Sequence, residues 1–236
     1  MDRILIAGCG DIALRVARLL APKSCLFGLV RNPAYFEKLR DAGIVPLLGD
    51  LDDRRSLQRV AGLANTVLHF APPPAVERAP SAPVLSLPPQ HQTAMTDTRT
   101  RHLLAALSQG RLPQRLIYIS TSGVYGDCKG EIVDETRSTR AQNARAKLRA
   151  DAERQIRRWA RRTGVHASIL RVPGIYAAER LPVERLKKGT PAIVEAEDGY
   201  TNHIHADDLA RCVVAALQHA QPNRMAGQHR ATTDPG

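Results

Sequence analysis

Aromatic residues, paired cysteines and long apolar runs are scarce in this sequence. Phe, Trp and Tyr make up only 4% of the 236 residues, which leaves few side chains for stacking on bases. The four cysteines, at positions 9, 25, 128 and 212, form no Cys-x-x-Cys pair, which argues against a disulfide framework and a zinc site. No apolar stretch approaches the length of a membrane span, and no signal peptide precedes the first predicted strand. We therefore expect a cytoplasmic protein with no membrane partner and no bound metal.

Positive charge, by contrast, is abundant. The chain has 34 Lys and Arg against 23 Asp and Glu, a formal net charge of +11. Such a surplus is compatible with binding to nucleic acid or to a membrane surface. The basic residues are spread along predicted helices, however, so we prefer a solvated surface. Nucleic-acid binding stays a disfavoured alternative, motivated by the arginines at positions 145, 149, 154, 157, 158, 161 and 162.

The first dozen residues predict a buried strand, a tight turn and the start of a helix. The apolar run over residues 3–7 is followed by Gly8-Cys9-Gly10-Asp11-Ile12-Ala13. In this G-x-G-x-x-A pattern, Gly8 permits the turn and Gly10 lets the backbone approach a pyrophosphate. The free N–H groups at the helix start, over Asp11 and Ile12, then face the phosphates. The pattern predicts a dinucleotide site, and a tight turn that binds nothing is the alternative.

Apolar strands and amphipathic helices alternate along the rest of the chain. Further strands are predicted at 25–30, 44–48, 66–71, 115–120 and 166–172, and helices at 34–42, 93–108, 139–163 and 206–219. This order predicts an α/β fold, a Rossmann-type doubly wound parallel sheet with a small C-terminal lobe. We assign residues 1–172 to the NAD(P)-binding domain and 173–236 to a lobe interleaved with it. The Pro-rich loop 72–90 is expected to be mobile and to lie beside a strand's carboxyl end.

The end of the second predicted strand carries the residue that selects between nicotinamide cofactors. A carboxylate there binds the ribose 2′-hydroxyl of NAD, whereas an arginine pairs with the 2′-phosphate of NADP. The sequence has Arg31 at this place and no Asp or Glu. It predicts NADP as the preferred cofactor, with NAD as the alternative; Arg31 is otherwise an ordinary exposed arginine.

Five stretches make the sequence similar to the extended short-chain dehydrogenases/reductases, the NAD(P)-dependent sugar epimerases and dehydratases. They are the glycine turn, Gly49-Asp50-Leu51, Ile119-Ser120-Thr121-Ser122-Gly123-Val124-Tyr125-Gly126, Arg171-Val172-Pro173-Gly174-Ile175-Tyr176 and Asn202-His203-Ile204-His205-Ala206-Asp207-Asp208-Leu209. Together they extend from residue 3 to about residue 217. The sequence looks most like the short, atypical members described as nucleoside-diphosphate-sugar epimerases.

The resemblance implies roles for residues at several strand ends. Thr121 falls where the family places its catalytic Ser/Thr, and Ser122 lies beside it. Such hydroxyls can hydrogen-bond a substrate carbonyl or alcohol while hydride moves. Further contacts to the cofactor are implied for Asp50, Leu51, Ala71, Pro72, Pro173 and Ile175.

The long helix departs from the family pattern. The family's acid/base is the Tyr of a Tyr-x-x-x-Lys pair, in which four-residue spacing places both groups on one helical face. Here Lys147 matches the lysine and is expected to bind the cofactor ribose, but Asn143 occupies the tyrosine position. An amide exchanges no proton near neutral pH, so the usual mechanism is interrupted. Tyr125 and Tyr176 are substitute acids in principle, although structural roles at the cleft edge are preferred for both.

The resemblance also bears on the C-terminal part and on assembly. The sequence stops soon after the last predicted helix, so we expect an open or shortened substrate lobe. Family members often pair through the helices that correspond to 93–108 and 139–163, which makes a homodimer one expectation. In the second helix, acidic partners such as Asp151 and Glu153 would have to meet the arginines. His203 and His205 lack a matching carboxylate or cysteine cluster, so we expect His205 to anchor its loop on the last helix.

Two functions therefore lead. The first is an NAD(P)-binding oxidoreductase or epimerase-like enzyme, NADP-preferring, that acts on a hydroxyl or carbonyl of a small or nucleotide-sugar substrate. The second is a non-catalytic NADP(H)-binding sensor or scaffold, motivated by the absent tyrosine.

Overall fold

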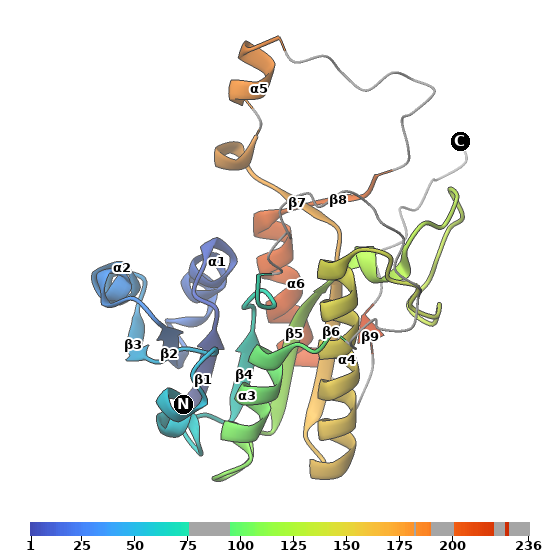
Figure 1. Cartoon of the computed structure of the whole chain (residues 1–236). Helices are drawn as coiled ribbons and strands as arrows, with labels where there is room; N and C mark the ends of the chain where they lie inside the picture. Colours follow the sequence, from blue (N-terminus) through green and yellow to red (C-terminus); the bar gives the residue numbers. More distant parts are fainter. Residues whose placement is uncertain (76–94, 182, 190–200, 220–224, 227–236) are drawn as a thin grey trace, which may run out of the picture.

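A parallel sheet forms the centre of the molecule (Figure 1). The structure, a computed structural model, describes residues 1–75, 95–181, 183–189, 201–219 and 225–226. Within these residues the main sheet has the strand order β3-β2-β1-β4-β5-β6-β9. The strands are β1 (Asp2–Ala7), β2 (Ser24–Val30), β3 (Ile44–Leu48), β4 (Thr66–His69), β5 (Arg115–Thr121), β6 (His166–Val172) and β9 (Met225–Ala226). The order reverses between β1 and β4, and open α/β sheets bind their ligands at such a switch point, outside the carboxyl ends of the strands.

Helices cover both faces of this sheet. In Figure 1, α3 and α4 lie on one face, and α1 and α6 lie on the other. The helices are α1 (Asp11–Leu20), α2 (Phe36–Asp41), α3 (Thr98–Leu107), α4 (Ala144–Thr163), α5 (Val183–Lys187) and α6 (Ala206–His219), joined by the 3-10 helices η1 (Pro33–Tyr35), η2 (Arg54–Val60), η4 (Ser122–Tyr125) and η5 (Ala178–Arg180). A separate parallel ribbon pairs β7 (Gly174–Tyr176) with β8 (His203–His205). The predicted doubly wound parallel fold is confirmed.

Two apolar layers hold the helices on the sheet. Alternate residues of β1 point to opposite faces, so Leu5 joins the cluster under α3 and α4 whereas Ile6 joins the cluster under α1 and α6. Both residues are fully buried, as expected for a parallel strand covered on both faces. The carboxyl edge of the sheet is therefore the part of each strand at which side chains and backbone can meet a ligand.

Several predicted boundaries are corrected by helix capping. The helix expected from residue 139 begins at Ala144, because the Asn143 side chain accepts a hydrogen bond from the backbone N–H of Ala146. The helix expected from residue 93 begins at Thr98, where Asp97 is the N-cap. The predicted strand 166–172 and helix 206–219 agree with the structure.

The C-terminal third contributes to the main layers as well as to the ribbon. α6 packs against α1, and β9 pairs with β6, although the sequence indicated neither β9 nor the β7–β8 ribbon. These strands have two or three residues, too few to show a period of two. The division at residue 172 stays a prediction. The predicted mobile loop 72–90 lies mostly outside the described residues.

Candidate functional site

The carboxyl ends of adjacent strands carry most of the residues predicted to bind the cofactor. Because all pairings in the main sheet are parallel, these ends share one edge. They bring together Gly8 after β1, Arg31 after β2, Asp50 and Leu51 after β3, Ala71 and Pro72 after β4, Thr121 and Ser122 at the end of β5, and Pro173 and Ile175 after β6.

The turn after β1 needs glycine because it passes directly against the end of β4. Gly8 has φ of +103°, and a Cβ at this position would lie 2.3 Å from the backbone nitrogen of Ala71. The N–H groups of both Phe70 and Ala71 donate to the carbonyl of Ala7. The next side chain, Cys9, is directed inward, and burial raises the pKa of its thiol to about 12. The turn is therefore closely packed beneath and holds no reactive thiolate.

The start of α1 is open on its outer side. Gly10 is exposed, has φ of −83°, and a Cβ built on it would meet no atom within 4 Å. Gly10, the N-cap of α1, has no side chain to accept a hydrogen bond from the first N–H groups of the helix. Free N–H groups at a helix start, reached past a residue without a side chain, suit an anionic phosphate. Ile12 differs from Gly10, because its side chain is buried among the residues under α1.

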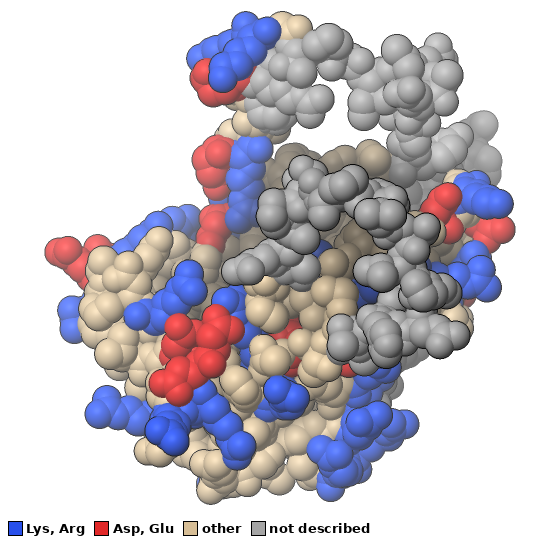
Figure 2. Space-filling model, in the orientation of Figure 1, with Lys and Arg blue, Asp and Glu red and all other residues tan. Residues whose placement is uncertain are grey.

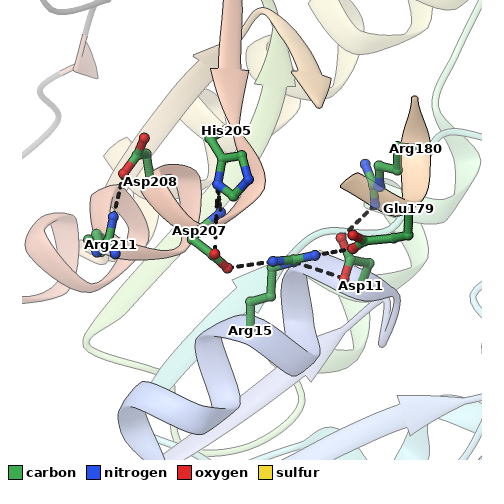
Figure 3. Close-up of polar contacts among 8 residues, drawn as sticks. All are labelled: Asp11, Arg15, Glu179, Arg180, His205, Asp207, Asp208 and Arg211. Carbon is green, nitrogen blue, oxygen red and sulfur yellow. Dashed lines mark hydrogen bonds and ion pairs between the residues drawn. The ribbon is translucent and has the colours of Figure 1, made fainter. Parts of the chain in front are cut away.

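Arg15 lies at the centre of a charged network that joins the first turn of α1 to the C-terminal segments (Figure 3). Its guanidinium donates to Asp11, with Nε 2.9 Å from Oδ1, and also to Glu179 and Asp207. Arg180 approaches the other Asp11 oxygen at 3.0 Å. The hydrogen bond from Arg15 holds the pKa of Asp207 below its usual range. Two guanidinium groups thus balance the Asp11 carboxylate, which leaves the start of α1 suited to a phosphate.

The ends of β2 and β3 form the next part of the edge. Arg31 is exposed and has no hydrogen-bond or ion-pair partner among the described residues. The N–H of Gly49 donates to the carbonyl of Val30, so the loop after β3 starts beside Arg31. Asp50 accepts a hydrogen bond from the N–H of Asp52, which shapes this loop. Arg31 is therefore available to an added anion.

The hydroxyl groups predicted to polarise a substrate lie at the end of β5. Thr121 is partly exposed, and its Oγ1 accepts a hydrogen bond from the N–H of Gly123 at 3.3 Å. Ser122 is also partly exposed. In contrast, Ser120 is buried and donates to Glu153. The two predicted hydroxyls are thus accessible at this edge, and the third is part of the core.

Asn143 and Lys147, which occupy the positions of the family's Tyr-x-x-x-Lys pair, have different surroundings at the start of α4. The amide of Asn143 caps the helix, and this contact accounts for the residue at that position. Lys147 is half-buried, and its Nζ has no partner among the described residues. The part of Lys147 in ribose binding stays a prediction. Tyr125 is buried, with the guanidinium of Arg171 4.7 Å from its ring centre, whereas Tyr176 is 44% exposed.

Arg149 is the basic residue of α4 that reaches the strand ends, a position that the sequence pattern did not predict. Its Nη1 donates to the carbonyl of Ile119 at 2.6 Å and to the hydroxyl of Tyr118 at 3.0 Å, and lies 3.4 Å from the carbonyl of Ala71. The residue is only 6% exposed. Arg149 therefore ties together the diverging ends of β4 and β5. Its spacing is the available signal, since positions 149, 153, 156 and 160 share the buried face of α4.

A buried ion pair continues this face one turn further along α4. Glu153 is fully buried and accepts hydrogen bonds from Ser120 at 2.6 Å and from Arg171 at 2.8 Å. Arg157 completes its shell at 2.8 Å. Glu153 thus connects α4 with the carboxyl-terminal halves of both β5 and β6.

His69, at the end of β4, is another buried polar residue close to Arg149. Its Nε2 lies 2.9 Å from Oγ1 of Thr100, which donates in turn to Asp97. Burial, with a contribution from the charge of Arg149, lowers the pKa of His69 to about 3. The imidazole is therefore neutral at physiological pH and serves as a packed polar group.

Basic side chains are widespread over the face in Figure 2, with a dense group at the lower end of α4. Arg149 does not contribute to this surface, and Arg154 forms an ion pair with Asp151. A hollow of about 440 Å³ between α3 and α4 is lined partly by Arg101, Arg158 and Arg162. Glu153, named as one acidic partner that pairing through this helix would need, is fully buried and therefore does not offer its charge to a second copy. Pairing of two copies stays a prediction.

Two further expectations concern the histidines and the membrane. Nδ1 of His205 accepts a hydrogen bond from the N–H of Asp207, which anchors the β8 loop on the first turn of α6. In the described part of the chain, no cluster of three or more His, Cys, Asp or Glu is arranged to hold a metal ion. Among the same residues, no helix combines the length and apolar character needed to cross a bilayer.

Known proteins agree with this architecture. Solved structures similar to the chain include a functionally unknown conserved protein from Silicibacter pomeroyi, with 27% identity and a TM-score of 0.67 over 95% of this chain and 71% of the other. The UDP-glucose 4-epimerase of Thermus thermophilus, solved with NAD, shares 22% identity and a TM-score of 0.73 over 96% and 78%. The UDP-glucuronic acid 4-epimerase of Bacillus cereus gives 20% and 0.74 over 94% and 76%. No curated protein matches the chain.

A match to a family model shows to which protein family the chain belongs. It matches residues 13–226, nearly the whole chain, and begins at Ala13, the last residue of the G-x-G-x-x-A pattern. The chain belongs to the NAD dependent epimerase/dehydratase family.

Proposed function

We propose that this protein binds NADP(H) in preference to NAD(H) and uses it in hydride transfer at a hydroxyl or carbonyl of a small or nucleotide-sugar substrate. The observation that carries the proposal is the turn at Gly8 and Gly10. A Cβ at Gly8 would collide with the backbone of Phe70 and Ala71, just after β4, whereas the space beside Gly10 is open. This is the arrangement that a pyrophosphate at the start of α1 requires.

In this proposal, each group of residues at the carboxyl edge of the sheet binds a different part of the cofactor. The N–H groups at the start of α1 take the pyrophosphate, and Arg31 takes the 2′-phosphate. Asp50 and Leu51 border the adenine, and Ala71, Pro72, Pro173 and Ile175 border the nicotinamide half. When bound, the nicotinamide supplies the acceptor or donor of the hydride.

Two hydroxyls contact the substrate, and two basic residues hold the parts of the site around it. Thr121 and Ser122 donate hydrogen bonds to the substrate oxygen and hold it in place. Lys147 holds the ribose. Arg149 keeps the ends of β4 and β5 at their spacing through its bonds to Ile119 and Ala71. Neither hydroxyl replaces the absent tyrosine as a proton donor near neutral pH.

The missing acid favours a second candidate, a non-catalytic NADP(H)-binding sensor or scaffold. The Asn143 amide is engaged at the helix cap, and Tyr125 is buried. Tight cofactor binding without hydride transfer to a panel of carbonyl compounds and nucleotide sugars would favour this candidate. Turnover of any of them would favour the enzyme.

The deciding experiment titrates the wild type and Arg31→Ala with NADPH and with NADH. Loss of a charge-assisted contact to the 2′-phosphate weakens NADPH binding by about 1–3 kcal/mol. NADH binding remains nearly unchanged, because NADH has no 2′-phosphate. Equal losses for both cofactors would contradict the role of Arg31, and absence of binding to the wild type would contradict the proposal as a whole.

A further inference from the structure

A carboxylate does lie beside the cofactor-selecting position, although it comes from the neighbouring strand. The sequence places no Asp or Glu at the end of β2, but Asp52 follows β3, and β2 and β3 are paired in parallel with Val30 opposite Leu48. The loop that carries Asp52 leaves the sheet at Gly49, whose N–H donates to the carbonyl of Val30, the residue before Arg31. Asp52 is itself exposed.

Asp52 is held by an arginine from a different part of the chain. Nε and Nη2 of Arg99, in the first turn of α3, contact the two oxygens of Asp52 at 2.8 and 2.6 Å. This two-point geometry is the strong form of an arginine–carboxylate pair. The hydrogen bonds and the charge of Arg99 hold the pKa of Asp52 below its usual range. The charge of Arg31 makes a smaller contribution in the same direction. Arg31 is therefore close enough to Asp52 for the two charges to interact.

Arg99 also fixes the loop after β4. Its Nη1 lies 3.2 Å from the carbonyl of Pro72 and 3.4 Å from that of Pro73. Only 18% of the Arg99 side chain is exposed, so the contact is well defined. One side chain therefore holds two of the loops that border the proposed cofactor site.

We propose that Arg99 is a positioning residue that sets the cofactor preference by occupying the Asp52 carboxylate. With Arg99 in place, Asp52 is unavailable to a ribose 2′-hydroxyl, and Arg31 remains available to pair with a 2′-phosphate. Without Arg99, Asp52 repels the 2′-phosphate, attracts Arg31 and accepts a hydrogen bond from the 2′-hydroxyl of NAD. The inference rests on the proposed NADP preference and adds the reason for it.

The test is the ratio of NADH to NADPH dissociation constants, measured by titration of the full chain. Arg99→Gln lowers this preference for NADPH about tenfold, a size typical of one uncompensated charge near a bound ion. Asp52→Asn keeps the preference, and Asp52→Asn combined with Arg99→Gln restores it to near the wild-type value. Arg101→Gln, an exposed arginine on the same helix, is the matched control and leaves the preference unchanged.

The outcomes separate the inference from the proposed function. A wild type that binds NADH as well as NADPH overturns the proposed preference and this inference with it. A wild type that prefers NADPH, together with an Arg99→Gln variant of unchanged preference, overturns the inference alone. If Arg99→Gln weakens both cofactors equally and Asp52→Asn restores neither, Arg99 only shapes the loops, which also overturns it. A changed ratio with rescue by Asp52→Asn confirms it.

Discussion

The two glycines of the phosphate turn should respond to alanine in opposite ways. At Gly8, a methyl group would lie 2.3 Å from the Ala71 nitrogen and 2.7 Å from its Cα, and φ is +103°. The positive φ costs about 1–2 kcal/mol for a residue with a Cβ. Displacement of two hydrogen-bonded backbone segments adds a similar amount, so Gly8→Ala should lower the free energy of unfolding by about 3 kcal/mol.

Gly10→Ala is the matched variant. The backbone there has φ of −83°, and nothing lies within 4 Å of the added methyl group. Alanine is a poorer N-cap than glycine by only about 0.5 kcal/mol, so the free energy of unfolding should remain near that of the wild type. The methyl group points into the space proposed for the pyrophosphate. NADPH affinity should therefore fall by about tenfold or more, because the backbone can no longer approach the phosphates.

The assay combines urea unfolding without ligand with a fluorescence titration by NADPH. The expected pattern is a destabilised Gly8→Ala protein and a stable Gly10→Ala protein that binds NADPH poorly. A Gly10→Ala variant that binds NADPH like the wild type would refute the placement of the phosphates. A Gly8→Ala variant as stable as the wild type would refute the argument from the Ala71 contact.

Three further predictions concern the buried polar residues Arg149, Glu153 and His69. Arg149→Met leaves the Ile119 carbonyl without its buried donor and should reduce the free energy of unfolding by about 1–3 kcal/mol, with Arg149→Lys intermediate; equal stability in urea would contradict the role of Arg149. Glu153→Gln leaves the buried Arg171 uncompensated and should cost about 3 kcal/mol by the same assay, whereas a loss under about 1 kcal/mol would contradict it. Because the folded pKa of His69 is about 3 and its ordinary value is 6.5, the unfolded chain binds more protons between these values. Stability should therefore fall as pH drops from 6.5 towards 3, by up to about 1.4 kcal/mol per pH unit, and His69→Gln should reduce this slope; an unchanged slope would rule out His69 as its source.

Local patterns are sufficient for the main strands and helices of the doubly wound sheet and for the glycine turn, although not for β9 or the β7–β8 ribbon. A continuous run of buried residues marks the strand at 166–172, and the amphipathic spacing of apolar residues marks the helix at 206–219. The conformation of Gly8 followed from the motif, since only glycine tolerates that φ at a turn against a neighbouring strand. Starts of helices were less accurate, as at Ala144, because a cap depends on one side-chain hydrogen bond.

The amino-acid sequence by itself therefore determined the doubly wound sheet, the glycine turn and the hydroxyl-bearing end of β5. Only the tertiary structure decided which charged side chains meet, because partners such as Arg99 and Asp52 are 47 residues apart and come together through packing of α3 on the loop after β3. Likewise, the sequence shows Arg149 as one of many arginines, and burial against β4 and β5 distinguishes it. Periodicity reports which residues face the core, whereas pairing of charges depends on distances between elements that no local pattern contains.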